Sequence, residues 1–304
     1  MNALDLIAYT RSILDASQGQ SGSGPWSDSD LLSYLSAAQR QLWAVQVDTN
    51  PWPYLLTATL ADLGLTFTTV TPGLIRAKMP RYVFRIEMLM ALITDGLEPV
   101  PVVGLQSLQN TVSDRYASNE TPSWFVGHGG DLYFTASAVD TSCYLAFYSM
   151  RPPDLVVFTA SADGTTTTTL ATKAESETLG ALRSDSQAYS GTTMEVVSAD
   201  ESLPEGELLR VSASAVTSYP TIRLTHDALS AAVEEGDTIA MVPLIDESFH
   251  ELLCYMAALR ALDQEGNLRD KDTLAQTTKD LYQRWLSINR RGQGQDEARM
   301  SYER

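Results

Sequence analysis

Apolar residues recur at steps of three and four over residues 27–49, a pattern typical of one face of an amphipathic α-helix. The repeating positions are Leu31, Leu35, Ala38, Leu42 and Val45. Ser27 precedes them as a candidate N-cap, and Asp28 and Asp30 lie in the first turn, where the helix dipole favours negative charge. Trp26 is expected to pack back onto the helix as a hydrophobic staple. The pattern therefore predicts a helix that begins at its own cap.

The same spacing predicts three other helices. Residues 2–16 are expected to form a short amphipathic helix, followed by a loop over 17–25. That loop either lets the first helix pack against a neighbouring subunit or is a simple interhelical turn. A helix that starts after Pro243 and ends at Gly266 as its C-cap precedes another over 270–291, and these two are expected to form a helical hairpin.

Between these helical regions, residues 54–150 change to a period of two. Short alternating runs separated by turn residues predict a small antiparallel sheet. The runs SWFV and DLYF are expected to pair as a hairpin around the turn GHGGD, whose glycines permit positive φ. Residues 105–122 are too polar for a strand, and they are expected to hold a short helix and a loop.

The segment 154–243 differs in composition from the rest of the chain. It is rich in Thr, Ser and Ala, and it holds 14 Asp and Glu against 4 Lys and Arg, so that -10 of the net charge lies here. Its strand-like runs include five consecutive threonines, which favour β-structure because threonine is branched at Cβ. The chain returns to a helical pattern directly afterwards. We therefore expect a second, all-β domain inserted into the first.

Together these patterns predict an α+β protein: a helical bundle of N-terminal helices and a C-terminal helical hairpin, with a small antiparallel β-region and an inserted all-β domain. Residues 1–153 and 244–304 are expected to form the core domain, and residues 154–243 a β-sandwich-like insertion. Residues 290–304 are polar and interrupted by two glycines, so they are predicted to form an extended C-terminal tail.

Composition and charge narrow the classes of function. The chain has 304 residues, of which 44% are hydrophobic and 19% are charged, as in globular rather than disordered proteins. Its formal net charge is -17. This excess of negative charge opposes tight binding to a nucleic-acid backbone, because such binding depends on Lys and Arg that displace counterions. The same charge is compatible with DNA that slides past an acidic wall.

The sequence carries no local signal for catalysis, a metal or a cofactor, and we expect that the protein is not an enzyme. Cys143 and Cys254 stand far apart among apolar residues and are expected to be buried. His128, His226 and His250 share no metal-ligand spacing, and His250 is expected on the polar flank of its helix. There is no signal-peptide pattern and no apolar run long enough to span a membrane, so we expect synthesis in the cytoplasm.

The order of these segments resembles the head-to-tail adaptor (connector) proteins of tailed bacteriophages. An N-terminal helix comes first, and then the tryptophan-led helix WSDSDLLSYLSAAQRQLW, the strand RYVFRIEML, the hairpin DGLEPVPVV and the helical LQSLQ. The hairpin TPSWFVGHGGDLYFTAS, the strand end YSMRPP and a helical hairpin that begins PLIDESFHELLCYMAALRAL complete the order. The resemblance covers residues 1–153 and 243–304 and rests on order and spacing; usual members lack a counterpart of 154–243.

The resemblance implies a structural virion protein that forms a ring, usually of twelve copies, at the neck between the portal and the tail. The helices would surround a channel that conducts DNA without binding it specifically, and the β-region would face the tail tube or nozzle protein. A C-terminal tail would dock into the portal, with candidate contacts Arg290, Arg291, Arg299 and Tyr302. Helix packing between subunits would use Trp26, Leu31, Leu35, Leu42 and Trp285.

A second interpretation gives the all-β segment a function of its own. Its many carboxylates leave open a tail-associated module that hydrolyses glycans, or one that binds tail fibres or the host surface. In either case we expect residues 154–243 to project outward, so that deleting them leaves ring assembly intact.

Overall fold

The computed structural model describes residues 1–18, 26–49, 51, 54–94, 96–102, 122–127, 130–161, 169–172, 178–180, 183, 187–198, 205–218, 221–265 and 271–302. For residues 17–18, 198, 216–218, 265 and 290–302 it describes the backbone alone. Over these residues the chain is mostly β, with 15 strands in three antiparallel sheets and four α-helices.

The predicted fold class is wrong in the balance of its parts. The sequence patterns favoured a helical bundle with a small β-region, whereas the described residues form a predominantly β protein. The helices are long and periodic, so they stand out in the sequence. Most strands have only two to six residues, which is too short for alternation to reveal how much of the chain they take up.

The chain forms two compact units. The first comprises Met1–Asn50 and Pro152–Arg304, and the second comprises Pro51–Arg151. The helices and the segment 154–243 thus belong to one unit, whereas the β-region between the helices is a unit of its own. This division differs from the expected one, which grouped that β-region with the helices and set 154–243 apart.

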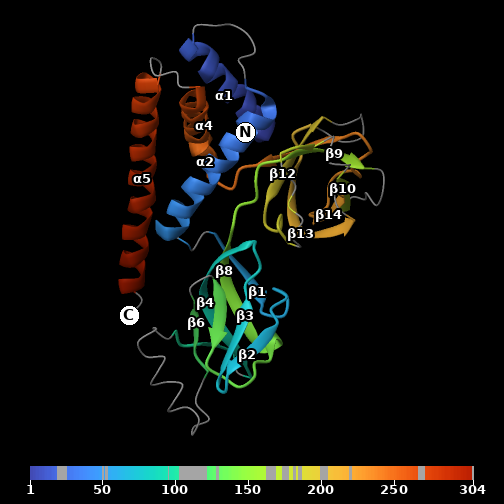
Figure 1. Ribbon diagram of the computed structural model, residues 1–304, viewed down its shortest axis with the longest axis vertical. Coiled ribbons are helices and arrows are strands. Elements are labelled where there is room, and N and C mark those ends of the chain that lie inside the picture. Colours follow the sequence, from blue (N-terminus) through green and yellow to red (C-terminus); the bar gives the residue numbers. More distant parts are fainter. Residues whose placement is uncertain are drawn as a thin grey trace. The chain divides into compact units, whose positions relative to one another are not determined.

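Four α-helices form the helical part of the first unit: α1 (Ala3–Gln18), α2 (Asp28–Thr49), α4 (His250–Glu265) and α5 (Lys271–Tyr302), with the 3-10 helix η5 (Glu247–Phe249) directly before α4. Helix α4 packs against α1, α2 and α5, and α2 also contacts α1 and α5. Figure 1 shows α4 and α5 running antiparallel, side by side, as the expected helical hairpin.

Side chains fix the first residues of α1 and α2. Asn2 Oδ1 accepts hydrogen bonds from the backbone amides of Leu4 (2.9 Å) and Asp5 (3.1 Å), and Asp5 Oδ2 accepts from Asn2 N at 3.1 Å. At α2, Asp30 N donates to Ser27 Oγ and Ser27 N donates to Asp30 Oδ2, both at 3.1 Å. The predicted N-cap Ser27 is confirmed, and each helix begins with a reciprocal capping pair of this kind.

Helix α5 continues past residue 291, where it was expected to end. Its backbone is helical as far as Tyr302, through Gly292 and Gly294. A glycine costs about 1 kcal/mol relative to alanine inside a helix, but the Arg, Gln, Glu, Ala and Met residues around these two are good helix formers. The segment expected to be an extended tail is therefore helical over residues 290–302.

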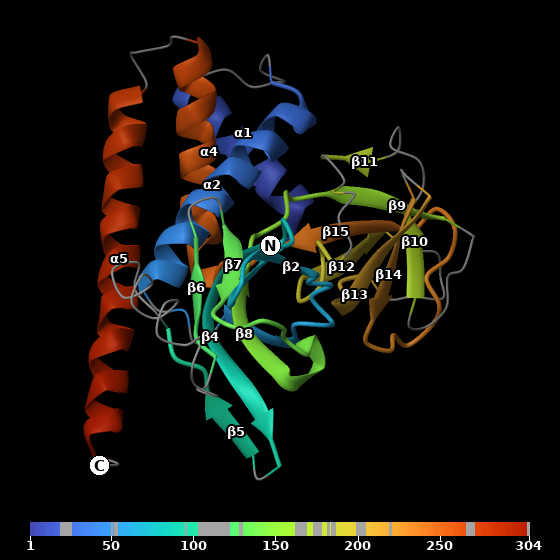
Figure 2. The same ribbon diagram turned by 60° about the horizontal axis from the view of Figure 1, so that its bottom comes forward.

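Six strands of the segment 154–243 close into a ring. Strand β9 pairs with β10, and the order β10-β14-β13-β12-β15 leads back to β9 through antiparallel pairs (Figures 1 and 2). The short strand β11 also pairs with β9. The bounds are β9 (Val157–Ser161), β10 (Thr169–Thr172), β11 (Thr178–Leu179), β12 (Thr193–Ser198), β13 (Leu208–Ser218), β14 (Thr221–His226) and β15 (Thr238–Val242). The expected sandwich-like arrangement is thus a small barrel, because β10 pairs with β9 as well as with β14.

The barrel and the helices share one hydrophobic core. Phe158, Met194 and Leu224 are buried in the barrel, and the same cluster of buried residues continues to Leu35 and Trp285 on the helices. A domain that folds by itself has its own core. The shared core is the reason why the barrel and the helices form one unit.

Helix α2 also holds the two segments that enter and leave the barrel. Gln39 is fully buried; its Nε2 donates to Pro153 O and its Oε1 accepts from Leu244 N, both at 3.1 Å. One turn earlier, Ser36 Oγ accepts from Leu155 N at 2.9 Å. We call Ser36 and Gln39 the α2 clamp. It gives hydrogen-bond partners to backbone groups that come directly before and directly after the barrel in the sequence.

The second unit contains two four-stranded sheets, with the orders β1-β8-β4-β5 and β2-β3-β7-β6. Their buried side chains, among them Leu89 and Tyr148 from one sheet and Phe134 from the other, form a core separate from that of the first unit. The strands are β1 (Leu55–Thr59), β2 (Phe67–Thr71), β3 (Leu74–Lys78), β4 (Val83–Ile93), β5 (Gly96–Pro99), β6 (Trp124–Val126), β7 (Asp131–Phe134) and β8 (Tyr144–Met150), with the 3-10 helix η3 (Thr141–Cys143) before β8.

Two strand pairings of the second unit define its hairpin and its ends. Strands β6 and β7 form the expected hairpin, from Trp124↔Phe134 to Val126↔Leu132. Strands β1 and β8 pair from Leu55↔Ser149 onward, so the first and last strands of the unit start and end side by side. Residues 105–121, in which a short helix was predicted, and the turn residue His128 lie outside the described residues.

Candidate functional site

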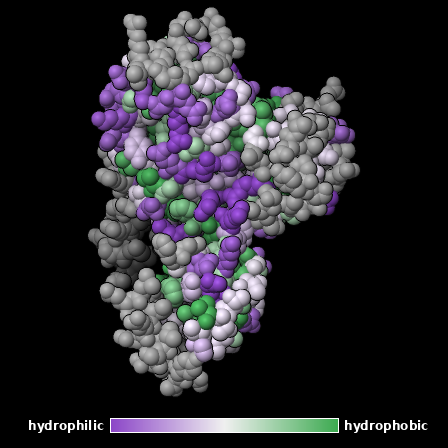
Figure 3. Space-filling view, in the orientation of Figure 1, coloured by the Kyte–Doolittle hydropathy of each residue, from purple (hydrophilic) through white to green (hydrophobic). Residues whose placement is uncertain are grey.

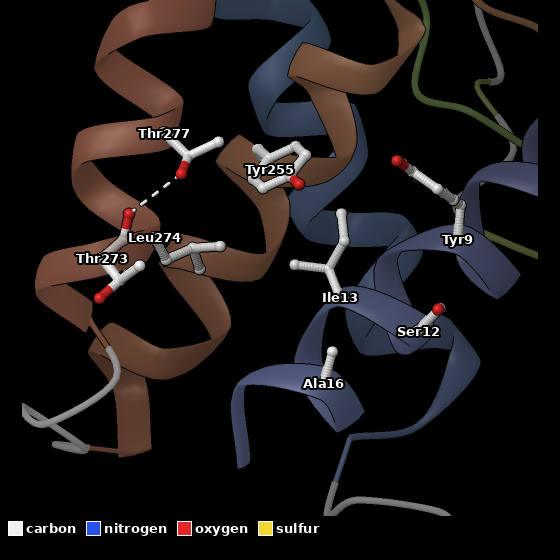
Figure 4. Close-up of a pocket in the computed structure, with 8 residues that line it drawn as sticks. All are labelled: Tyr9, Ser12, Ile13, Ala16, Tyr255, Thr273, Leu274 and Thr277. Carbon is white, nitrogen blue, oxygen red and sulfur yellow. Dashed lines mark hydrogen bonds between the residues drawn. The ribbon is translucent and has the colours of Figure 1, made fainter. Parts of the chain in front are cut away.

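An open groove of about 540 Å³ lies between α1, α4 and α5. In Figure 4 the side chains of α1 lie opposite those of α5, with Tyr255 of α4 between them. The groove is lined by Tyr9, Ser12, Ile13, Ala16, Tyr255, Thr273, Leu274 and Thr277. We call it the helical groove. Its lining residues are aliphatic, aromatic or hydroxyl-bearing, and none of these eight is charged.

Two hydroxyl groups of the helical groove make local hydrogen bonds. Thr277 Oγ1 donates to Thr273 O at 3.2 Å, as the dashed line in Figure 4 shows. Tyr9 OH donates to Glu251 Oε1 at 3.3 Å. Burial, and after it the negative charge of Glu251, raises the pKa of Tyr9, so this phenol stays neutral near pH 7. Neutral hydroxyls beside aliphatic groups give the groove the chemistry of a contact surface.

The described histidines are both in the interior of the first unit. His226 and His250 are buried, so the expectation that His250 lies on a polar flank is wrong. His250 Nε2 lies 2.9 Å from Ile245 O and His226 Nδ1 lies 2.7 Å from Asp227 O, so each ring donates to a carbonyl. Burial lowers the pKa of both rings. Each ring therefore acts in packing, at its own position in the fold.

The two cysteines have different environments. Cys254 is buried as expected; its thiol lies 3.7 Å from Leu6 O, and burial raises its pKa to about 12. Cys143 is exposed, and the expectation that it is buried is wrong. It is the last residue of the 3-10 turn η3, which Asp140 caps. The exposed turn lies directly before the half-buried strand β8.

Metal ligands and membrane-spanning helices are both lacking from the described part of the chain. No group of three or more His, Cys, Asp or Glu residues there is placed to hold a metal ion. No helix among those residues is long and apolar enough to cross a membrane.

The five residues expected to pack between subunits are buried within the single chain. Leu31, Leu35, Leu42 and Trp285 have no exposed surface, and Trp26 is 7% exposed. All five belong to the core that the helices share with the barrel. The apolar spacing identified the buried helix faces correctly, but the buried faces meet their own chain. A contact with a second copy therefore has to use other residues.

The four residues expected to dock into the portal lie in the second half of α5: Arg290, Arg291, Arg299 and Tyr302. Phe249, directly before α4, packs edge-to-face on Trp285, with ring centroids 6.5 Å apart. The residues from 286 to 302 therefore run beyond the start of α4, for about 25 Å at 1.5 Å per residue. Figure 1 shows this overhang of α5 past α4.

Sequence reasoning missed an apolar hairpin tip in the second unit. Leu92, Ile93 and Leu97 are 44%, 50% and 46% exposed, and we call them the apolar tip. Strand β4 pairs with β8 only as far as Ala91↔Tyr144, whereas its pairing with β5 continues to Ile93↔Gly96. Figure 2 shows β4 and β5 projecting as a ribbon. A run of apolar residues around a turn was the available signal, but such a run also fits a buried hairpin.

Large apolar surfaces mark contact sites on many proteins. On the face shown in Figure 3, hydrophobic residues occur in small separate groups among hydrophilic and neutral ones. Three local features of the described residues are candidates for contacts: the helical groove, the apolar tip and the overhang of α5. A comparison with protein-family models and with curated proteins gives no match for the chain.

Proposed function

We propose that this protein is a structural virion protein of a tailed bacteriophage, a head-to-tail adaptor that forms a ring, expected to have twelve copies, between the portal and the tail. The order of segments in the sequence is the basis of this proposal. In keeping with that order, α1, α2 and the α4–α5 hairpin lie in the regions 1–50 and 244–304.

The observation that carries the proposal is the overhang of α5. A helix that runs about 25 Å past the start of α4 presents a long side to another protein. Residues 290–304 hold four arginines against three acidic residues, whereas the whole chain has a net charge of -17. A projecting helical segment that lacks the strong negative charge of the rest of the chain is suited to dock into a portal.

The charge of the chain also supports a passage for DNA. An acidic protein does not gain the counterion release that holds proteins to phosphates. DNA is therefore expected to pass through the ring without specific binding.

Imaging tests the proposal directly. The purified protein is mixed with the portal protein of the same phage, and particles are classified by electron microscopy. A ring of defined symmetry seated on the portal is the expected result. Portal particles that stay bare at saturating concentrations of this protein would contradict the adaptor function.

Removing residues 290–304 tests the role of the overhang. We expect the shortened chain to lose only the helical circular dichroism signal of residues 290–302, to keep the rest of its fold, and to lose portal binding. The double variant Arg290→Glu/Arg291→Glu is expected to weaken binding at least roughly tenfold if charge contributes. The double variant Lys279→Glu/Arg284→Glu, at exposed positions of the same helix within the hairpin, changes the net charge equally and is the matched control. Equal losses in both variants would assign the effect to net charge and not to the overhang.

The alternative function of the segment 154–243 gains no support from the barrel. Phe158, Met194 and Leu224 fill its interior, so the described residues of the barrel enclose a packed core. The described interior of the barrel therefore offers no space for a glycan, whereas a contact between tail fibres and the outer surface of this segment stays a prediction.

A further inference from the structure

A line of apolar residues on α5 packs against α4 and then continues into the overhang. Its described members are Leu274, Leu281, Trp285 and Ile288, which follow one another at helical steps of seven, four and three residues. Leu274 and Trp285 are buried, and Leu281 packs against the same core. Ile288 lies almost one turn beyond Trp285, past the start of α4, and it is 45% exposed. The packing line is therefore longer than the partner that α4 provides for it.

A small pocket lies at the corner where α5 runs past the start of α4. Four of its lining residues are apolar: Phe249 and Leu252 from η5 and α4, and Leu281 and Ile288 from α5. Its volume is about 90 Å³. This is about three times the share of one water molecule in the liquid, which is space for one aliphatic side chain. We call it the corner pocket.

The two charged residues of the corner pocket are both exposed. Glu251 and Arg284 line it, and their charges stay hydrated at its rim. Exposed rim charges contribute little to the affinity of a contact, whereas groups that fill a buried pocket contribute most of it. An aliphatic side chain is therefore the group that the pocket fits, and reversing the charge of Arg284 should leave such a contact intact.

The geometry of α5 favours a helix as the element that carries this side chain. Within the hairpin, the packing line of α5 takes up a helix, α4, side by side (Figure 1). From Ile288 the backbone stays helical to Tyr302, a distance of about 21 Å at 1.5 Å per residue. A second helix of about four turns can pack along this stretch in line with α4. Its end then meets the corner pocket.

We propose that a helix of the portal protein packs along the overhang of α5, in line with α4, and inserts one aliphatic side chain into the corner pocket. The inference rests on the proposed function, in which the overhang docks into the portal. The portal is the occupant we choose because the corner pocket is continuous with that overhang. The inference adds the element and the class of side chain that the portal supplies, and it assigns Ile288 as a residue that decides the contact.

Two substitutions at one position test the contact. Ile288→Asp places a charge at the pocket, and Ile288→Trp keeps the position apolar but fills the pocket. Gln283→Asp and Gln283→Trp introduce the same residues at an exposed position of α5 that does not line the pocket. Circular dichroism and thermal unfolding check that each variant is folded. If the charged variant unfolds, Ile288→Trp still tests the pocket.

Binding to the portal protein of the same phage is measured by biolayer interferometry. We expect both Ile288 variants to weaken binding at least roughly tenfold, as the loss of a central contact does. Both Gln283 variants should bind like the wild type. Hydrogen–deuterium exchange of the portal should show a helical segment that is protected by the wild type and not by Ile288→Asp.

The results separate this inference from the proposed function. If the wild type binds the portal and the Ile288 variants bind equally well, or if the Gln283 variants lose as much, the corner pocket is not the contact, while the adaptor function stands. Protection confined to non-helical portal segments would overturn the helix as the occupant. Self-association of the chain alone that depends on Ile288, measured by sedimentation velocity, would assign the pocket to a second copy instead. A wild type that does not bind the portal contradicts the adaptor function itself.

Discussion

Gln39 shows how a single buried amide can join two parts of a fold. Its neighbours on α2 form an apolar stripe, and a polar side chain next to such a stripe is expected to be solvent-exposed. In the structure both ends of its amide are used, one by Pro153 O and the other by Leu244 N. The amide thus satisfies backbone groups that are far apart in sequence, and it does so without exposed surface.

We expect Gln39→Leu to lower the free energy of unfolding by about 2–4 kcal/mol, because a buried carbonyl and a buried amide lose their partners. Urea denaturation followed by circular dichroism measures this loss. Gln41→Leu, at an exposed position of the same helix, is the control and should change stability by no more than about 0.5 kcal/mol. Similar losses in both variants would show that the α2 clamp is not the cause.

His250 links stability to pH. Burial lowers its pKa below 6.5, while in the unfolded chain the ring takes up a proton near that value. Around it, Asp246 and Glu247 favour the charged ring and the N-terminal amine opposes it. Its contribution to stability is therefore complete above about pH 6.5 and is lost as the pH falls through the lower folded value.

His250→Gln keeps a donor for Ile245 O but does not titrate. We expect this variant to lose less stability than the wild type between pH 7 and pH 5, as measured by urea denaturation at each pH. An unchanged difference between the two pH values would contradict a role of His250. His226→Gln is the parallel variant for the other buried ring.

The burial of His250 follows from a second apolar face of α4, which the sequence analysis did not use. The sequence predicts a single helix after Pro243, whereas a 3-10 turn at 247–249 comes first and α4 begins at His250. His250 then shares a face with Leu253 and Cys254, three and four residues later, and that face is buried. Ser27, by contrast, was predictable because a cap depends only on its local sequence.

Among the elements, α5 shows that two glycines do not end a helix whose other residues are good helix formers. Two glycines in a polar stretch predicted an end near residue 291, yet the helix runs to Tyr302. We expect Gly292→Ala together with Gly294→Ala to stabilise this half of the helix by about 1–2 kcal/mol and to raise the helical signal in far-ultraviolet circular dichroism.

Gly292→Pro is the opposing variant, because proline removes a backbone donor and clashes with the preceding turn. It should reduce the helical signal by the contribution of the last turns of α5. If neither variant changes the spectrum, residues 290–302 do not form a helix in solution. Portal binding of the alanine variant should be at least as strong as that of the wild type.

Local elements were predictable from this sequence, whereas their assembly was not. The helices and the hairpin around residues 127–131 follow from spacing and turn residues within one short window. The closure of the barrel depends on the pairing of Ala171 with Ser161 and of Leu170 with Leu224, and no local pattern encodes which strands meet. The helical groove and the apolar tip depend on that assembly too, which is why neither was predicted.

At the scale of the whole molecule, the two units differ in how self-contained they are. The barrel shares its core with the helices and is held by the α2 clamp. The unit of residues 51–151 has its own core, and its first and last strands are neighbours. Domains with adjacent ends and separate cores tolerate excision and insertion. The segment that behaves as an insertion is therefore expected to be 51–151.

Two deletions test this expectation. Replacing residues 52–150 with a short glycine-serine linker should leave the first unit folded, with a cooperative thermal transition. Replacing residues 156–241 should abolish that transition, because the helices lose the barrel side of their core. Expression of residues 51–151 alone should give a folded unit. A cooperative transition after loss of the barrel would instead support the independent insertion first expected from the sequence.

The pairing of Leu55 with Ser149 has a mechanical consequence. A force that separates residue 50 from residue 152 acts on the second unit at neighbouring positions of β1 and β8. Such a force does not shear the five paired positions together; it loads the ladder from one end and opens its hydrogen bonds one after another. Under tension applied at residues 50 and 152, the second unit would therefore peel open at low force.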